Sequence, residues 1–223
     1  MSRLPGRAAR AALAAYRHSP AAARAHVLVR WLSCPFDPVV DVLPRTGRVL
    51  EVGCGHGLFS TYLAARSPQL TVHGVDIDQD KIAVARGTVG GPADHRTFEA
   101  STSGEVPAGP WDAVVLVDVL YLLDAAGQRG LLEECAARLA PGGLLVVKDM
   151  ATTPRWKARV NALQEAVSVR VLGITEGSAD FAFVDPDERA RWLTGAGLLD
   201  VRARRLDRGR AHPHHLLVGR APR

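Results

Sequence analysis

The stretch from residue 49 to residue 60 constrains the fold more than any other part of this chain. An apolar run over 49–52 predicts a short buried strand, and apolar side chains recur at helical spacing over 58–63. Between the two runs stand three glycines at alternate positions: Gly53, Gly55 and Gly57. The order of strand, tight glycine loop and helix predicts the start of a doubly wound α/β unit.

The glycine loop also predicts a ligand site. Glycine lacks a Cβ, so a ligand can lie directly on the backbone, and open α/β sheets bind ligands at the carboxyl ends of their strands. A dinucleotide loop would require glycine where Leu58 stands, and the acidic Glu51 suits a cationic ligand better than a pyrophosphate. Asp76 follows the next predicted strand, 71–75, and is placed to accept hydrogen bonds from a ribose diol.

Four segments in order along the chain resemble the motifs of the class I S-adenosylmethionine-dependent methyltransferases. They cover roughly residues 48–150 and read Glu51-Val-Gly-Cys-Gly-His-Gly, Gly74-Val-Asp-Ile-Asp, Trp111-Asp-Ala-Val-Val and Pro141-Gly-Gly-Leu-Leu. The ordered set favours this family over a glycine turn in some other α/β protein. The resemblance implies a doubly wound, seven-stranded, mostly parallel sheet whose last strand is antiparallel.

A length of 223 residues suits a single methyltransferase domain. We expect an N-terminal helical cover over 1–47, a cofactor-binding core over 48–150, a helical substrate-side insertion over 151–185, and the last helix and strands over 186–223. Two helices are predicted within the cover, at 7–17 and 20–32. In the resembled family such helices often cover the substrate mouth, but simple packing on the sheet and contact with a membrane surface stay open.

Further elements are predicted from periodicity, from helix caps at Asp78, Asp124 and Asp185, and from glycine or proline breaks. The predicted helices are 57–66, 79–87, 124–139, 154–171 and 186–195, the first of them following the glycine loop. The predicted strands are 48–52, 71–75, 95–99, 111–119, 144–148, 198–206 and 214–219. Pro141-Gly142-Gly143 is expected to separate the helix that ends near 139 from the strand over 144–148.

The resemblance implies a set of contacts to S-adenosylmethionine, with S-adenosylhomocysteine as the product. The matching positions are Glu51, Gly53, Cys54, Gly55, Asp76, Ile77, Ser101, Asp118 and Val119. Asp76 would hold the ribose hydroxyls, Ile77 would pack on the adenine, and Asp118 and Val119 would flank the methionine end. Where the family often shows Gly-Asp-Ala to bind the adenine amine, this chain offers Ser101 or Glu99.

Methyl transfer needs a general base only if the acceptor loses a proton. The candidates are Tyr121, Asp149, His18 and the histidines of the cluster 212–215, of which His214 and His215 are favoured. Histidine suits this role near neutral pH, although a histidine cluster near a chain end is more often part of the surface or of a strand end. No metal is expected, because Pro213 and strand alternation point the clustered side chains apart, and Met150 replaces the asparagine of metal-dependent catechol-type members.

The expected function is transfer of a methyl group to O, N or C of a small organic or lipid-like acceptor by in-line displacement. Asp118-Val-Leu-Tyr stands where base-methylating enzymes carry Asn/Asp-Pro-Pro-aromatic, and aromatic and basic residues are not interleaved, so no nucleic acid is expected. A nicotinamide-dependent oxidoreductase and a non-catalytic S-adenosylmethionine-binding module remain as alternatives.

Charge, cysteine content and the pattern of apolar stretches indicate the cellular compartment. The formal net charge is +5, with arginine concentrated toward both ends of the chain. Three cysteines, Cys34, Cys54 and Cys135, show neither disulfide nor metal spacing. Apolar stretches near the start are interrupted by arginine, so neither a signal core nor a membrane span is expected. These features favour a cytoplasmic protein.

Overall fold

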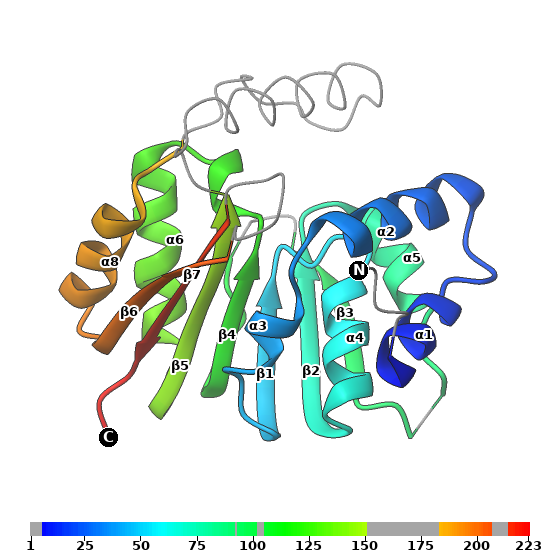
Figure 1. Ribbon diagram of the computed structural model, residues 1–223. Helices are drawn as coiled ribbons and strands as arrows, with labels where there is room; N and C mark the ends of the chain where they lie inside the picture. Colours follow the sequence, from blue (N-terminus) through cyan, green and yellow to red (C-terminus); the bar gives the residue numbers. More distant parts are fainter. Residues whose placement is uncertain (1–5, 92, 102–104, 151–182, 207–213) are drawn as a thin grey trace.

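A seven-stranded sheet forms the centre of the computed structural model, with strand order β3-β2-β1-β4-β5-β7-β6 (Figure 1). The structure describes residues 6–91, 93–101, 105–150, 183–206 and 214–223. The strands are β1 (Thr46–Val52), β2 (Gln69–Asp76), β3 (Arg96–Ala100), β4 (Trp111–Val117), β5 (Leu139–Met150), β6 (Leu199–Arg205) and β7 (His214–Arg220). Pairings among β1 to β5 are parallel, whereas β7 runs antiparallel to β5 and β6. The predicted fold class is confirmed.

Helices flank the sheet and bury its two faces. They are α1 (Arg7–Ala14), α2 (Ala21–Ser33), α3 (Asp37–Val40), α4 (Leu58–Arg66), α5 (Gln79–Arg86), the short 3₁₀ helix η1 (Leu120–Leu122), α6 (Ala125–Ala137) and α8 (Pro186–Gly195). Because neighbouring strand residues point to opposite faces, Val49 joins the core beneath α1, α2 and α4, while Leu50 joins the core beneath α6 and α8. Figure 1 shows α6 and α8 beside β5 to β7, and α1 and α5 toward β2 and β3.

Helix starts follow the predicted caps. The Asp78 carboxylate accepts hydrogen bonds from the backbone N–H groups of Asp80 and Lys81 at the start of α5. Asp124 caps α6 and Asp185 caps α8 in the same way. Each cap satisfies donors that the first helical turn leaves without a partner.

The predicted start of β5 is wrong, and one helix was missed. β5 begins at Leu139 and runs through the expected break at 141–143, because a register shift against β4 between Trp111 and Ala113 absorbs the extra residues. Such a bulge lets proline and glycine remain within a strand. The four-residue helix α3 was not expected. The helix predicted over 154–171 lies outside the described residues.

β4 is buried along most of its length, as its continuous apolar run predicts. It ends at Val117, two residues earlier than expected, because Asp118 adopts a left-handed backbone conformation with a φ of 57°. The chain therefore turns at the carboxyl end of the sheet, beside the glycine loop.

Candidate active site

The glycine loop is tied to the end of β2. The N–H groups of Gly53 and Cys54 both donate to the Val75 carbonyl, at 2.8 and 2.9 Å. Gly53 has a φ of 72°, and a Cβ added there would lie 2.4 Å from Val119 Cγ2. Only glycine satisfies both the backbone conformation and this close approach. The loop and the turn after β4 therefore form one continuous surface.

Asp76 lies at the mouth of this loop, at the carboxyl end of β2. Its carboxylate accepts the N–H of Gly55 at 2.7 Å and the N–H of Asp78 at 3.0 Å. Next to it, the Ile77 side chain is 63% exposed. An acceptor group beside an exposed apolar side chain suits a ribose carrying a flat base, as the resemblance implies.

Ser101 and Glu99 differ in how they relate to Asp76. The Ser101 N–H donates to the Asp76 carbonyl at 2.9 Å, and its hydroxyl donates to the Glu105 carbonyl at 3.0 Å. Glu99 lies 3.6 Å from His73 Nε2. Of the two candidates for the adenine contact, Ser101 is therefore the one held beside Asp76.

Glu51 lies beneath the loop and is 3% exposed. Its carboxylate accepts hydrogen bonds from the Ser60 N–H at 3.0 Å and from the Ser60 hydroxyl at 2.5 Å. Burial raises the pKa of Glu51 to about 7, although both hydrogen bonds from Ser60 act in the opposite direction. Cys54 is also buried, and burial raises the pKa of its thiol. Glu51 thus anchors the first turn of α4 to the strand that carries the loop.

Asp118 is the centre of a buried ionic cluster. Lys148 Nζ lies 2.6 Å from each of its carboxylate oxygens, and Arg30 Nη1 lies 2.7 Å from one of them. Burial alone would raise the pKa of Asp118, but the positive charges of Lys148 and Arg30 hold it well below its usual range. Lys148 and Arg30 were not among the predicted site residues. A lysine inside the apolar strand 144–148 was the signal that could have identified one of them.

Asp149 lies on the opposite face of β5 from Lys148. It is 1% exposed, and its carboxylate lies 3.0 Å from Arg189 Nη1 of α8. Burial raises the pKa of Asp149 to about 6, against the effect of Arg189. The structure therefore separates Asp149 from the Asp118 cluster, although the two acids end adjacent strands.

The two favoured histidines also lie on different faces. In the antiparallel β5–β7 pair, His215 stands opposite Asp149, and His214 stands opposite Met150. Directly opposed residues share a face, so His214 lies on the face of Lys148 and Asp118. The His214 imidazole, when protonated, is accordingly among the charges that lower the pKa of Asp118. The structure brings His214, but not His215, to the cluster.

The remaining base candidates are more scattered. Tyr121 is buried in η1 and stacks on Phe183, with ring centroids 6.1 Å apart and an interplanar angle of 10°. His18 lies between α1 and α2 and accepts a hydrogen bond from Arg17 at 2.9 Å. His212 lies outside the described residues. Within the described ranges, no group of three or more His, Cys, Asp or Glu side chains is arranged to hold a metal ion.

A family model described as "Methyltransferase domain" matches residues 23–202, which is well over half of the chain. This match agrees with the strand order of the sheet and with the glycine loop after β1. The chain belongs to the class I S-adenosylmethionine-dependent methyltransferases. The cofactor of these methyltransferases is S-adenosylmethionine, so the nicotinamide alternative is dropped.

Known methyltransferases resemble this one in sequence and fold. A protein of Xanthomonas axonopodis pv. citri (strain 306), named Ubiquinone biosynthesis O-methyltransferase, is 31% identical over 158 residues, covering 70% of this chain and 64% of the relative. The chain thus spans less than two thirds of that relative's length. The apo structure of the S-adenosylmethionine-dependent methyltransferase SibL superposes with a TM-score of 0.68 at 23% identity, covering 97% of this chain and 70% of SibL.

A third match contains a product-bound cofactor site. The magnesium protoporphyrin IX methyltransferase of Synechocystis PCC 6803, solved with bound S-adenosylhomocysteine, gives a TM-score of 0.64 at 20% identity, covering 83% of this chain and 81% of that one. At these identities the structures establish a shared fold. In the present chain, the Asp76 carboxylate and the exposed Ile77 side chain lie at the mouth of the glycine loop, an arrangement compatible with the ribose and adenine of the cofactor.

In the present chain, α2 and the turn after α1 contact the glycine loop directly. Tyr16 donates its hydroxyl to the His56 carbonyl at 2.7 Å, and the His26 ring of α2 lies 4.8 Å from the His56 ring. Arg30, also on α2, reaches Asp118. On its outer side α2 exposes Leu28, Val29 and Leu32, so a membrane contact stays a prediction. None of the helices in the described ranges has the length and apolar character needed to span a bilayer.

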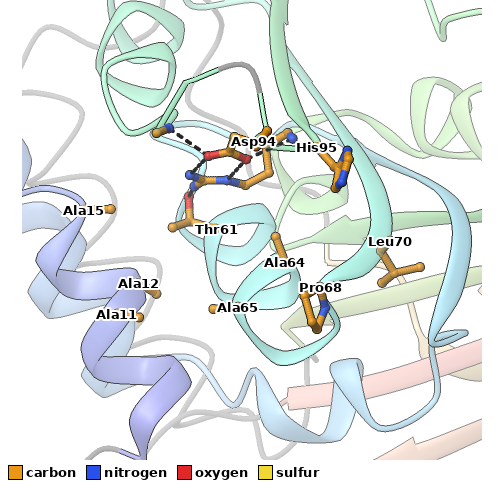
Figure 2. Close-up of a pocket in the computed structure, with 13 residues that line it drawn as sticks. Ala11, Ala12, Ala15, Thr61, Ala64, Ala65, Pro68, Leu70, Asp94 and His95 are labelled. Carbon is orange, nitrogen blue, oxygen red and sulfur yellow. Dashed lines mark hydrogen bonds and ion pairs between the residues drawn. The ribbon is translucent and has the colours of Figure 1, made fainter.

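A pocket of about 400 Å³ opens between α1, α4 and the start of β3 (Figure 2). Leu70 and His95 line it and lie near the amino ends of β2 and β3, so it is at the opposite end of the sheet from the glycine loop. Arg96 in its wall pairs with Asp94 and donates to Thr61 Oγ1 at 2.7 Å. The guanidinium is thus already engaged, and we assign this pocket no part in methyl transfer.

Proposed function

We propose that the chain transfers a methyl group from S-adenosylmethionine to an oxygen atom of a small organic acceptor that carries a hydroxyl group. The observation that carries this proposal is the convergence of two sets of residues at one end of the sheet. Gly53, Gly55 and Asp76 follow β1 and β2, and His214 begins the antiparallel β7 beside Asp118. The name of the Xanthomonas relative supports oxygen as the accepting atom.

The chemistry asks little of the protein beyond alignment and water exclusion. When bound, the cofactor supplies an electrophilic methyl group on sulfur. The protein must hold the acceptor oxygen in line with the methyl carbon and receive the hydroxyl proton. In the proposal, the His214 imidazole takes this proton, and the nearby Asp118 carboxylate stabilises the imidazolium that results. The C–O bond forms as the C–S bond breaks, and S-adenosylhomocysteine leaves with the electron pair on sulfur.

The proposed acceptor is apolar in part. Tyr121 lies in η1, just after β4, and Phe183 lies just before α8. Their rings stack with centroids 6.1 Å apart. A flat, aromatic hydroxyl compound would pack against such rings with little loss of conformational entropy. Two of the other base candidates are assigned smaller roles: Tyr121 would contact the acceptor, and Asp149 would hold α8 through Arg189.

The test is product analysis with a labelled methyl donor. The purified chain is incubated with S-adenosylmethionine carrying a ¹³C-methyl group and with matched phenols, catechols, anilines and aliphatic amines. We expect ¹³C-methyl ethers, identified by mass spectrometry and the NMR shift of the new methyl group. The control is Asp76→Ala, which should form much less product at the same concentration of methyl donor. Methylamines would instead identify nitrogen as the acceptor, and intact S-adenosylhomocysteine binding without product from any compound would favour the non-catalytic binding module.

A further inference from the structure

Lys148 is a fully buried lysine in β5, directly after the apolar run 144–147. It is 0% exposed, and its neighbours Val146 and Val147 belong to the two hydrophobic cores. Lysine is almost never fully buried unless it is paired. A buried ion pair is often no more stable than apolar side chains of the same volume. Stability alone is therefore a weak reason for a lysine at this position.

Lys148 holds both the backbone and the side chain of Asp118. Its carbonyl accepts the Asp118 N–H at 2.8 Å, and its ammonium group lies 2.6 Å from both Asp118 carboxylate oxygens. Asp118 has a φ of 57°, a conformation that non-glycine residues adopt when their surroundings fix it. The two contacts with Lys148 are well suited to fix this turn.

The turn forms one wall of the glycine loop. Val119 follows Asp118, and its side chain occupies the space that a Cβ on Gly53 would need. Arg30 reaches the same carboxylate from α2. A change in the orientation of Asp118 would therefore move Val119 relative to the loop and release α2. Asp76 and Ile77, which lie beside β3, would be left in place.

We propose that Lys148 is a positioning residue for the methionine portion of the cofactor and acts through Asp118. The inference rests on the proposed function in one respect, the binding of S-adenosylmethionine, whose methionine end the family resemblance places beside Asp118 and Val119. Lys148 fixes the turn, the turn fixes Val119 against Gly53, and the methionine end of the cofactor lies against that surface. The adenosine end depends on Asp76 and is independent of Lys148.

Two ligands separate positioning from a merely structural role. S-adenosylhomocysteine carries the whole amino-acid portion, whereas 5′-methylthioadenosine keeps the adenosine and lacks it. Calorimetric titration of both ligands would compare the wild type with Lys148→Met, Asp118→Asn and the double variant. Lys148→Met keeps the length of the side chain and removes the charge. Arg129→Met, which removes an exposed cation paired with Glu133 on α6, is the matched control.

We expect Lys148→Met to weaken S-adenosylhomocysteine binding by at least about tenfold and methylthioadenosine binding by less than about twofold. In the Asp118→Asn background, Lys148→Met should weaken S-adenosylhomocysteine binding by less than about threefold, because the carboxylate through which Lys148 acts has been removed. Asp118→Asn conserves volume, and should show the same ligand-selective loss even if Lys148→Met folds poorly.

Equal losses for both ligands, or additive effects of the two substitutions, would overturn the inference. So would an unchanged affinity for S-adenosylhomocysteine. These outcomes are distinct from failure of the proposed function. If the wild type binds S-adenosylhomocysteine but methylates no acceptor, the proposed function fails while the comparison of variants still decides the role of Lys148. If the wild type binds neither ligand, the cofactor placement fails and the inference fails with it.

Discussion

Gly55 donates its backbone N–H to the Asp76 carboxylate at 2.7 Å, so the acid proposed to hold the ribose also closes the glycine loop. Asp78 donates to the other carboxylate oxygen at 3.0 Å. An ionised carboxylate can accept about four hydrogen bonds, so each oxygen keeps capacity for a ribose hydroxyl. Asp76 thus couples the shape of the loop to the ligand that the loop receives.

Asp76→Ala should weaken S-adenosylhomocysteine binding by about 100-fold, because two hydrogen bonds to a charged acceptor contribute about 1.5 kcal/mol or more each. Asp76→Asn keeps one acceptor oxygen for the Gly55 N–H and should lose less. Isothermal titration calorimetry measures both variants against the wild type. A loss smaller than about threefold in the alanine variant would remove Asp76 from the ribose site.

Gly53→Ala should disrupt the loop, because it combines a φ of 72° with a Cβ 2.4 Å from Val119 Cγ2. We expect a destabilisation of about 1–3 kcal/mol and a loss of cofactor affinity of at least tenfold. The matched control is Gly130→Ala on α6, where an added Cβ meets nothing within 4 Å. That substitution should stabilise the protein by about 0.5–1 kcal/mol through helix propensity. Thermal unfolding and calorimetry compare the two; similar effects would contradict the role of Gly53.

Glu51 should make stability depend on pH. Burial raises its pKa from an ordinary 4.5 to about 7, so between these values the folded state binds more protons than the unfolded state. Stability is then greatest below about pH 4.5 for this group and is lost as pH rises through 7, by about 2–3 kcal/mol. The Glu51→Gln variant should lack this component.

Urea unfolding at pH 5, 6, 7 and 8 would measure the contribution of Glu51 as the difference in free energy of unfolding between the wild type and Glu51→Gln. Asp149 has a raised pKa of about 6 and shifts stability in the same direction, but it is present in both proteins and cancels. A difference that stays constant across this range would show that Glu51 does not titrate as described.

Local features of the chain were predictable from sequence, and distant pairings were not. The glycine loop and the caps at Asp78, Asp124 and Asp185 depend on residues a few positions apart, and the structure agrees with them. Arg30 and Lys148 meet Asp118 across 88 and 30 positions in the sequence. Nothing in the local pattern specifies such a contact, because it depends on how α2 and β5 pack.

The alternation of side chains along a strand explains why neighbouring candidate residues were separated. Asp118 and Asp149 lie at the ends of adjacent strands, but Lys148 takes the face toward Asp118 and therefore directs Asp149 toward Arg189. The same alternation separates His214 from His215. The alternation of side chains could be predicted from the sequence. Which face of β5 and β7 lies toward Asp118 could be determined only from the structure.

Arg189→Met should destabilise the protein by about 3–5 kcal/mol, because it leaves the Asp149 carboxylate buried without its ionic partner. Arg189 also donates to Gln128 Oε1 at 3.0 Å and thereby joins α8 to α6. Adding Asp149→Asn should recover most of the loss by removing the stranded charge. Urea unfolding measures the free energies, with Arg129→Met as an exposed control expected to change stability by less than about 0.5 kcal/mol. A double variant no more stable than Arg189→Met would contradict this account of the pair.

His214 and His215 provide the sharpest test of the proposed chemistry, because they are adjacent in sequence and lie on opposite faces of β7. His214→Asn should lower kcat by about 100-fold or more if His214 takes the acceptor proton, with S-adenosylhomocysteine affinity nearly unchanged. His215→Asn should lower kcat by less than about fivefold, since His215 stands opposite Asp149, away from Asp118.

The rate of S-adenosylhomocysteine formation would be measured across pH with an acceptor identified in the labelling experiment. Wild-type activity should rise with pH as the imidazole loses its proton, and this rise should disappear in His214→Asn alone. Equal losses in the two variants, or a pH profile that both retain, would remove His214 as the base and leave alignment as the whole of the protein's contribution.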